Sequence, residues 1–227
     1  MSLILCSCPV AVAQDEMERY RLEAVQRLEA EIGQLEAEQS GAQTLAGLAH
    51  TRFFLGTVTP DQNSALSHFQ AGLSDAGKAL RIQADNRSAQ LWSVTNTLQI
   101  FKIKKPLRAL WSMDDLEAQL HELKRNDRNF AHAAPDRVLA VLYAQAPEWL
   151  LGSPEKAERH FMAALELAPD FPANTLLFAE FLLDQGRKKQ ARAVMSSWST
   201  RGGLVDFPLY EMIWLMDILR IEQRLAE

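Results

Sequence analysis

Apolar residues recur every three or four positions along most of this chain, which is the spacing of amphipathic helices that bury one face. One set of small and large side chains also recurs 34 positions later: Ala157, Phe161 and Ala164 are followed by Ala191, Met195 and Trp198. The same spacing occurs a third time, at Ala65, Phe69 and Gly72. The pattern therefore predicts repeated helical units rather than a single irregular bundle.

A period of about 34 residues is that of the tetratricopeptide repeat (TPR), a pair of helices that stacks on its neighbours. Pro169 closes the set that begins at Ala157, as in the second helix of that repeat. We therefore predict an all-α protein, a TPR-like helical solenoid of antiparallel helix pairs in a right-handed superhelix. Such repeats build binding surfaces and usually perform no chemistry.

Helices of a different kind are expected at both ends of the repeats, which occupy about residues 43–200. Residues 15–39 form a long helix with one apolar stripe, made of Leu22, Val25, Leu28, Ile32 and Leu35. This stripe predicts a capping helix laid on the first repeat, and the alternative is a coiled coil that joins two chains. A second capping helix is expected at residues 207–226, because solenoids need capped ends.

Polar residues and breakers mark several helix ends. Asp61 or Asn63 can cap one helix, Asp114 or Asp115 another, and Asn174 stands where an N-cap is expected. Residues 100–106 read as a loop, and Gly186 as a turn between two helices of a pair.

The connection at residues 146–152 is longer than a standard repeat allows and carries Trp149. Long ordered loops are often functional. We expect this loop to act either as a lid over a groove or as a plug in the superhelix.

Residues 1–13 resemble the end of a secretory signal, so the folded domain is expected to span residues 14–227. A short apolar run ends in an Ala-x-Ala site, which predicts cleavage after Ala13. Lipidation at Cys8 and a cytoplasmic tail are the alternatives, and the missing basic region suggests a start upstream of Met1. Cys6 and Cys8 have no further cysteine with which to complete a metal site.

Composition and motifs exclude other function classes. The chain has 227 residues, a net charge of −5 and only one short basic stretch, which argues against nucleic acid as a partner. No Gly-rich phosphate loop and no Gly-x-Ser-x-Gly elbow occur. His121-Glu122 begins a metalloprotease-like string, but position 125 is Arg. We therefore expect no enzyme, no cofactor and no bound metal.

Three segments carry a family resemblance: residues 137–147 (RVLAVLYAQAP), residues 151–161 (LGSPEKAERHF) and residues 168–180 (APDFPANTLLFAE). Together with Gly186 they resemble the T-component of tripartite ATP-independent periplasmic (TRAP) transporters, over about residues 76–197. The resemblance implies a helical protein with cryptic TPR motifs, often a lipoprotein, that pairs with a periplasmic solute-binding subunit. A periplasmic or exported binding and scaffolding protein is thus expected, the alternative being a general TPR adaptor.

Candidate contact residues are polar and aromatic side chains of the first helices, which line the concave face of stacked pairs: Trp92, Asn96, Arg137, Asn174 and Glu180. Tyr143 and Trp149 are further candidates at the rim of that face. Arg137 could clamp a carboxylate or be paired internally, and Glu180 could bind a ligand or form an ion pair. The two tryptophans could equally serve packing. The expected partner is a protein, such as the solute-binding subunit, or a small hydrophobic or anionic ligand, with self-association through residues 15–39 as a further possibility.

Overall fold

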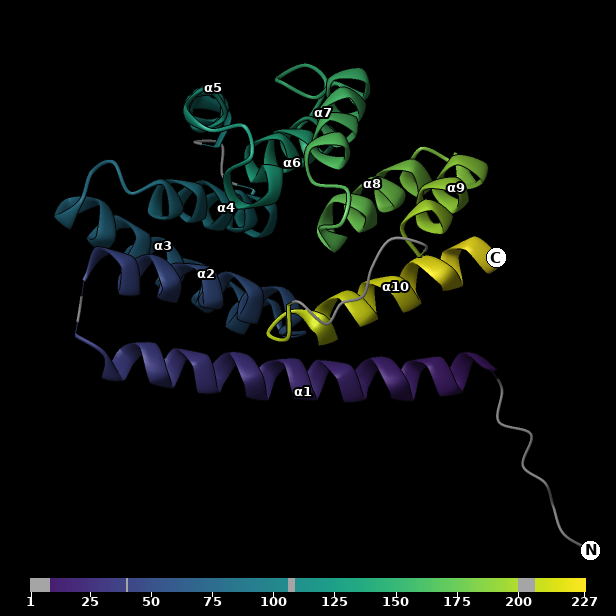
Figure 1. The fold of residues 1–227 in the computed structure, drawn as a ribbon, viewed down its shortest axis with the longest axis horizontal. Coiled ribbons are helices and arrows are strands. Elements are labelled where there is room, and N and C mark those ends of the chain that lie inside the picture. The colour runs from purple at the N-terminus through teal and green to yellow at the C-terminus, as the bar shows by residue number, and fades with distance from the viewer. Residues whose placement is uncertain (1–8, 40, 106–108, 200–206) are drawn as a thin grey trace, which may run out of the picture.

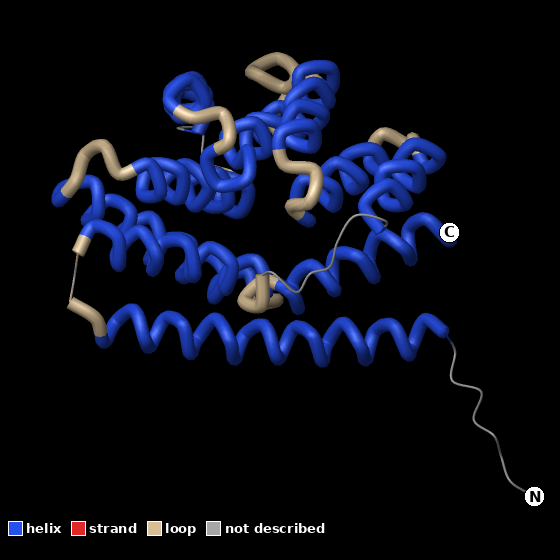
Figure 2. The backbone as a smooth tube through the Cα atoms, viewed as in Figure 1, coloured by secondary structure: helices blue, strands red, loops and turns tan. Residues whose placement is uncertain are grey.

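Helices are the only regular elements in the part of the chain that a computed structural model describes, residues 9–39, 41–105, 109–199 and 207–227 (Figures 1 and 2). Their bounds are α1 Pro9–Ala37, α2 Ala42–Val58, α3 Gln62–Ile82, α4 Arg87–Lys104, α5 Ala109–Asn126, α6 Phe130–Gln145, α7 Pro154–Leu167, α8 Pro172–Asp184, α9 Lys188–Ser199 and α10 Glu211–Ala226. The predicted all-α class is confirmed.

Neighbouring helices in the chain pack side by side, most extensively α2 with α3, α6 with α7, and α3 with α4, and α8 also packs on α9. The recurring residues sit at these contacts: Ala157 and Ala164 are fully buried, and Phe161 is 2% exposed. Phe69 is buried against Gly56 of α2, where an added Cβ would lie 2.6 Å from its ring. The repeated spacing therefore reports close contacts between helices.

The long helix α1 lies across the body of the protein, along both α2 and α10 (Figure 1). It buries Ala24, Leu28 and Ile32, which are four residues apart and so share one face. Leu22 does not belong to this stripe as predicted, because it lies off that face and is 51% exposed. The stripe packs within the chain, on α2 and on Met212 and Ile213 of α10.

Two predicted helix boundaries around position 106 are wrong. Residues 100–104 continue α4 instead of forming a loop, and Lys105 ends it in the left-handed conformation with φ of 43°. Lysines in the last turn favour a helix C-terminus, whose free carbonyl groups attract positive charge. The next helix, α5, begins at Ala109, so neither Asp114 nor Asp115 can cap it.

Other boundaries agree with the sequence. The side chain of Asp61 accepts a hydrogen bond from the Ser64 amide at 2.8 Å and caps α3. Gly186 adopts φ of 71° in the turn between α8 and α9, a conformation that glycine enters without steric cost. Residues 146–152 connect α6 to α7 as expected.

The signal-like segment is largely outside the described residues, including Cys6 and Cys8. Residues 9–13 form the first turns of α1, which therefore starts earlier than the predicted residue 15. In the described part of the chain, no helix combines the length and apolarity needed to cross a bilayer.

Candidate functional site

Asn174 and Arg137 form a buried node between α6 and α8. Asn174 is inaccessible to solvent, and its Oδ1 accepts a hydrogen bond of 2.7 Å from the guanidinium of Arg137. Its Nδ2 donates to the carbonyl oxygens of Ala164 at 3.0 Å and Ala168 at 2.9 Å, at the end of α7. Asn174 is not the predicted N-cap, since α8 starts at Pro172 after Phe171. Proline is favoured in that first position, and the helix starts three residues earlier than predicted.

Arg137 holds an unusual piece of backbone in place. Residues 131–133 all have left-handed conformations, with φ of 48°, 58° and 60°, which is costly for residues other than glycine. Arg137 donates to the carbonyl oxygen of His132 at 2.8 Å, and its guanidinium lies 4.8 Å from the ring centre of Phe171. Burial lowers the pKa of Arg137 to about 10. These internal bonds favour a structural role for Arg137 over a ligand clamp.

Asn96, like Asn174, is a buried asparagine that joins two helices, here α2 and α4. It is fully buried and donates to the carbonyl oxygens of Ala49 at 3.2 Å and Trp92 at 2.7 Å. An added Cβ at Gly72 of α3 would approach its Oδ1 to 2.7 Å, so the three helices meet closely here. Neither buried asparagine is accessible to a ligand.

Trp92 belongs to an aromatic seam that crosses several helices. Its ring stacks on His50 with centroids 4.1 Å apart. The hydroxyl oxygen of Tyr210 lies 3.0 Å from Nε2 of His50. Tyr210 contacts Trp214 in turn, and Trp214 contacts Phe171 at 5.4 Å. Burial lowers the pKa of His50 to about 3, so this imidazole stays neutral at physiological pH.

Tyr143 lies in a polar cluster that joins α5, α6 and α7 and comprises Glu117, His121, Lys124, Asp136, Tyr143 and His160. The hydroxyl of Tyr143 donates to the carboxylate of Glu117, and its ring stacks on His160 with centroids 5.4 Å apart. Fully buried Asp136 accepts from Lys124 at 2.7 Å and from His160 at 2.6 Å. The cluster thereby ties α5 to the α6–α7 pair.

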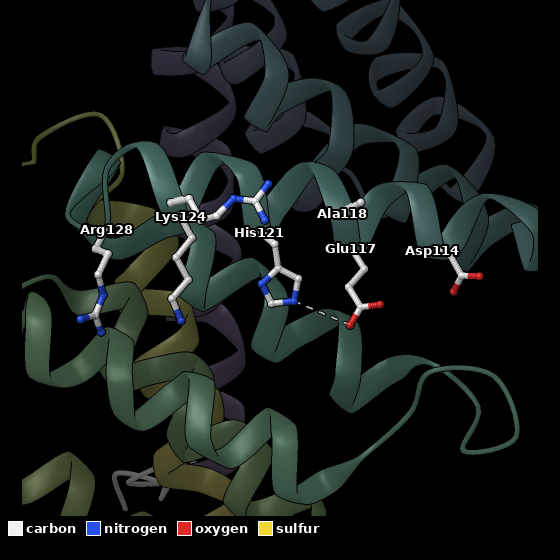
Figure 3. A pocket seen from close by; sticks show the side chains of 7 residues that line it. Asp114, Glu117, Ala118, His121, Lys124 and Arg128 are labelled. Atoms are coloured by element: carbon white, nitrogen blue, oxygen red, sulfur yellow. Dashed lines mark ion pairs between the residues drawn. The ribbon is translucent and has the colours of Figure 1, made fainter.

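The charges of this cluster are set by burial and by pairing. Burial alone would raise the pKa of Asp136, but hydrogen bonds from His160 and Lys124 outweigh it and hold that pKa below its ordinary value. Burial and the nearby Glu117 raise the pKa of Tyr143, which therefore remains a phenol. A hollow of about 670 Å³ opens beside the cluster along α5 (Figure 3).

The remaining two candidates, Glu180 and Trp149, differ in their surroundings: Glu180 is paired within the chain and Trp149 is exposed. Glu180 forms an ion pair of 3.2 Å with Arg220 of α10, and Asp217 joins the same arginine at 2.8 Å. Burial raises the pKa of Asp217 to about 6 despite that arginine. Trp149, in the connection between α6 and α7, is 72% exposed.

The predicted residues are thus spread over several separate places, and most are bonded to other parts of the chain. The sequence analysis missed the polar cluster, whose one local signal is the spacing of Glu117 and His121 by one helical turn. No group of three or more His, Cys, Asp or Glu among the described residues is placed to hold a metal ion.

A comparison with known protein families shows to which family the chain belongs. A family model described as the TRAP transporter T-component matches residues 19–194. The chain belongs to the TRAP transporter T-component family. The match begins well before residues 76–197, over which the sequence resembles this family, and it includes α2, α3 and the polar cluster. No curated protein matches this T-component. Membership of the family indicates a protein that works with a TRAP transporter.

Proposed function

We propose that this T-component is a non-enzymatic, exported binding or scaffolding subunit that engages a protein partner of the transporter. Family membership over residues 19–194 is the observation that carries the proposal. The structural data supply a reason to favour a protein over a small ligand. Most candidate side chains on α4, α6 and α8 already form hydrogen bonds within the chain, whereas the large aromatic side chain of Trp149 is exposed to solvent.

We further propose that the helix pairs stack as a TPR-like solenoid. The burial of equivalent positions supports this arrangement, since Ala65, Phe69, Ala157, Phe161 and Ala191 are all at most 6% exposed. Helices α2, α4, α6 and α8 also contact one another in sequence along one side of the pairs. Such a stack presents an extended surface to a protein.

Trp149 is our choice for a partner contact outside the stack. A tryptophan exposed over 72% of its surface gains from burial in an interface, and tryptophan is enriched among residues that dominate binding energies. The loop that carries it is fixed by three backbone bonds to the carbonyl oxygen of Pro147, from Leu150, Leu151 and Gly152. A preorganised loop loses little entropy when it binds.

Copurification from the native host tests the proposal. A tagged chain should recover a TRAP solute-binding or permease subunit, and Trp149→Ala should weaken that association by about tenfold or more. Met162→Ala is the matched control, because Met162 is another exposed apolar side chain, at 56%, and lies on α7 and not in the loop. Recovery of no transporter subunit would contradict the transporter role, and recovery of unrelated proteins alone would favour a general adaptor. Equal effects of the two variants would contradict the choice of Trp149.

A further inference from the structure

The hollow beside the polar cluster has a basic end. His121, Lys124, Arg125 and Arg128 line this end of the hollow, whose volume is about 670 Å³. Figure 3 shows His121, Lys124 and Arg128 extending from α5 and the turn after it towards the same side. Arginine and lysine side chains that converge in this way are the groups with which proteins bind phosphate and carboxylate groups.

The two arginines at the basic end have no partner within the described part of the chain. Arg125 and Arg128 are exposed, and neither guanidinium forms an ion pair or a side-chain hydrogen bond with another described residue. An arginine side chain stays protonated at any physiological pH. Both guanidinium groups therefore hold a full positive charge and free hydrogen-bond donors at the edge of the hollow.

The carboxylates around the basic end are committed to other residues or point elsewhere. Asp127 lies between the arginines in sequence and pairs with Arg87 at 3.1 Å. Asp136 accepts a hydrogen bond of 2.7 Å from Lys124, so the charge of that ammonium is already balanced. Glu122 of α5 is exposed and does not line the hollow. The charge of the two arginines is thus left for a group from outside the chain.

Stabilisation of the end of α5 does not account for both arginines. Basic side chains in the last turn of a helix interact favourably with its free carbonyl groups, and Lys124 and Arg125 lie in that turn. Arg128 comes after Asn126, at which α5 ends. Its guanidinium nevertheless extends into the hollow, on the same side of the helix as Lys124 (Figure 3). A ligand in the hollow gives a reason for this placement.

We propose that the basic end of the α5 hollow binds a soluble small molecule that carries a phosphate monoester group. Such a group has a charge of about −2 near neutral pH, which matches two guanidinium groups. Each guanidinium can donate two parallel hydrogen bonds to phosphate oxygens. The ammonium of Lys124 keeps further donors besides the one that bonds Asp136. His121 adds no charge, because burial lowers its pKa and leaves the imidazole neutral at pH 7.

The lining of the hollow favours a soluble ligand over a lipid surface. Proteins that lie on membranes bury bulky apolar side chains next to the basic groups that meet the headgroups. The large apolar side chains that are exposed among the described residues are Leu22, Ile82, Trp149 and Met162, and none of them belongs to α5. A hollow of about 670 Å³ also leaves room for the organic part of the ligand. The site uses none of the residues assigned to partner binding, so either proposal can fail without the other.

Titration with glycerol 3-phosphate, followed by NMR of the arginine Nε–Hε groups, tests the site on the full chain. The resonances of Arg125 and Arg128 should shift and saturate together. Arg125→Gln with Arg128→Gln should raise the dissociation constant about tenfold or more, because it removes both charges and their hydrogen bonds. Arg125→Lys with Arg128→Lys should cause a smaller loss, since an ammonium keeps the charge but not the paired donors.

Two controls separate the site from general charge effects and from membranes. Lys188→Gln with Lys189→Gln removes two exposed positive charges from α9 and should change the dissociation constant by less than about twofold, because salt screens distant charges. Phosphatidylcholine vesicles that contain phosphatidic acid present a phosphate monoester on a membrane and should not recruit the protein.

Several results would overturn the proposal. These are no saturable binding of glycerol 3-phosphate by the wild type, an unchanged affinity in the Arg125/Arg128 glutamine variant, and an equal loss in the Lys188/Lys189 variant. Circular dichroism confirms that each variant is folded. Recruitment to the phosphatidic acid vesicles that requires the two arginines would also overturn it, because the ligand would then be a lipid headgroup and not a soluble molecule.

Discussion

Replacement of His50 by Phe should make the protein less sensitive to acid. His50 lies against Trp92, and burial lowers its pKa from 6.5 to about 3. Between these two pH values His50 is therefore neutral in the folded chain and protonated in the unfolded chain. A group with a lowered histidine pKa contributes stability that is present above pH 6.5 and is lost as the pH falls towards 3.

The size of this effect follows from the two pKa values. Between about pH 7.5 and pH 5, protonation of the unfolded imidazole should cost about 2 kcal/mol of folding free energy. This is an upper bound because the His50 side chain is half-buried and not fully shielded from solvent. Phe cannot take up the proton and keeps the contact with Trp92. It leaves the hydroxyl of Tyr210 without its imidazole partner, at a cost of about 1 kcal/mol that does not depend on pH in this range.

Urea unfolding at the two pH values measures these free energies. The variant should be slightly less stable than the wild type at pH 7.5 and more stable at pH 5. Other histidines with lowered pKa values, such as His121 and His132, titrate in both proteins, so their contributions cancel in the comparison. Equal losses of stability in the two proteins would refute the burial argument for His50.

Four further substitutions test the packing. Asn174→Ala should cost roughly 2–4 kcal/mol in urea unfolding, because it removes three buried side-chain hydrogen bonds, one from Arg137 and two to carbonyl oxygens at the end of α7. A cost below about 1 kcal/mol would contradict the node. Gly56→Ala should destabilise the protein by about 1–3 kcal/mol, because the added methyl group clashes with Phe69. Gly33→Ala, on open helix surface, should stabilise it by about 0.5–1 kcal/mol. A higher melting temperature for Gly56→Ala than for Gly33→Ala would contradict this reasoning. Leu28→Ala should cost about 2–5 kcal/mol if α1 shares the core, and an unchanged unfolding midpoint would show that it does not.

Local patterns in the sequence predicted what local physics determines. The recurrence of Ala157 and Phe161 marked contacts between paired helices because a small residue must face a large one wherever two helices approach closely. Asp61 predicted a cap for the same reason, since its side chain satisfies an amide three residues away.

The candidate site depended on contacts between distant segments, which the sequence does not display. Asn174 is of a residue type that often caps helices, and yet it is buried and donates to carbonyl oxygens at the end of α7. Asp136, likewise, finds its partners on α5 and α7, 12 and 24 residues away. Only Trp149 was exposed as its loop suggested.

The position of α1 has a consequence for how the chain is made. Its buried residues Ala24 and Leu28 share a core with Met212 and Ile213, and Arg27 reaches Glu211 at 3.6 Å. Helix α1 thus needs α10, which is made much later, to complete its packing, and contacts between such distant segments slow folding. Helix pairs in between can pack before α10 exists, but the core that α1 shares with α10 cannot be completed before α10 has been made. A growing chain therefore carries an apolar helix face that is unsatisfied until α10 arrives, and this face is available to chaperones throughout that interval.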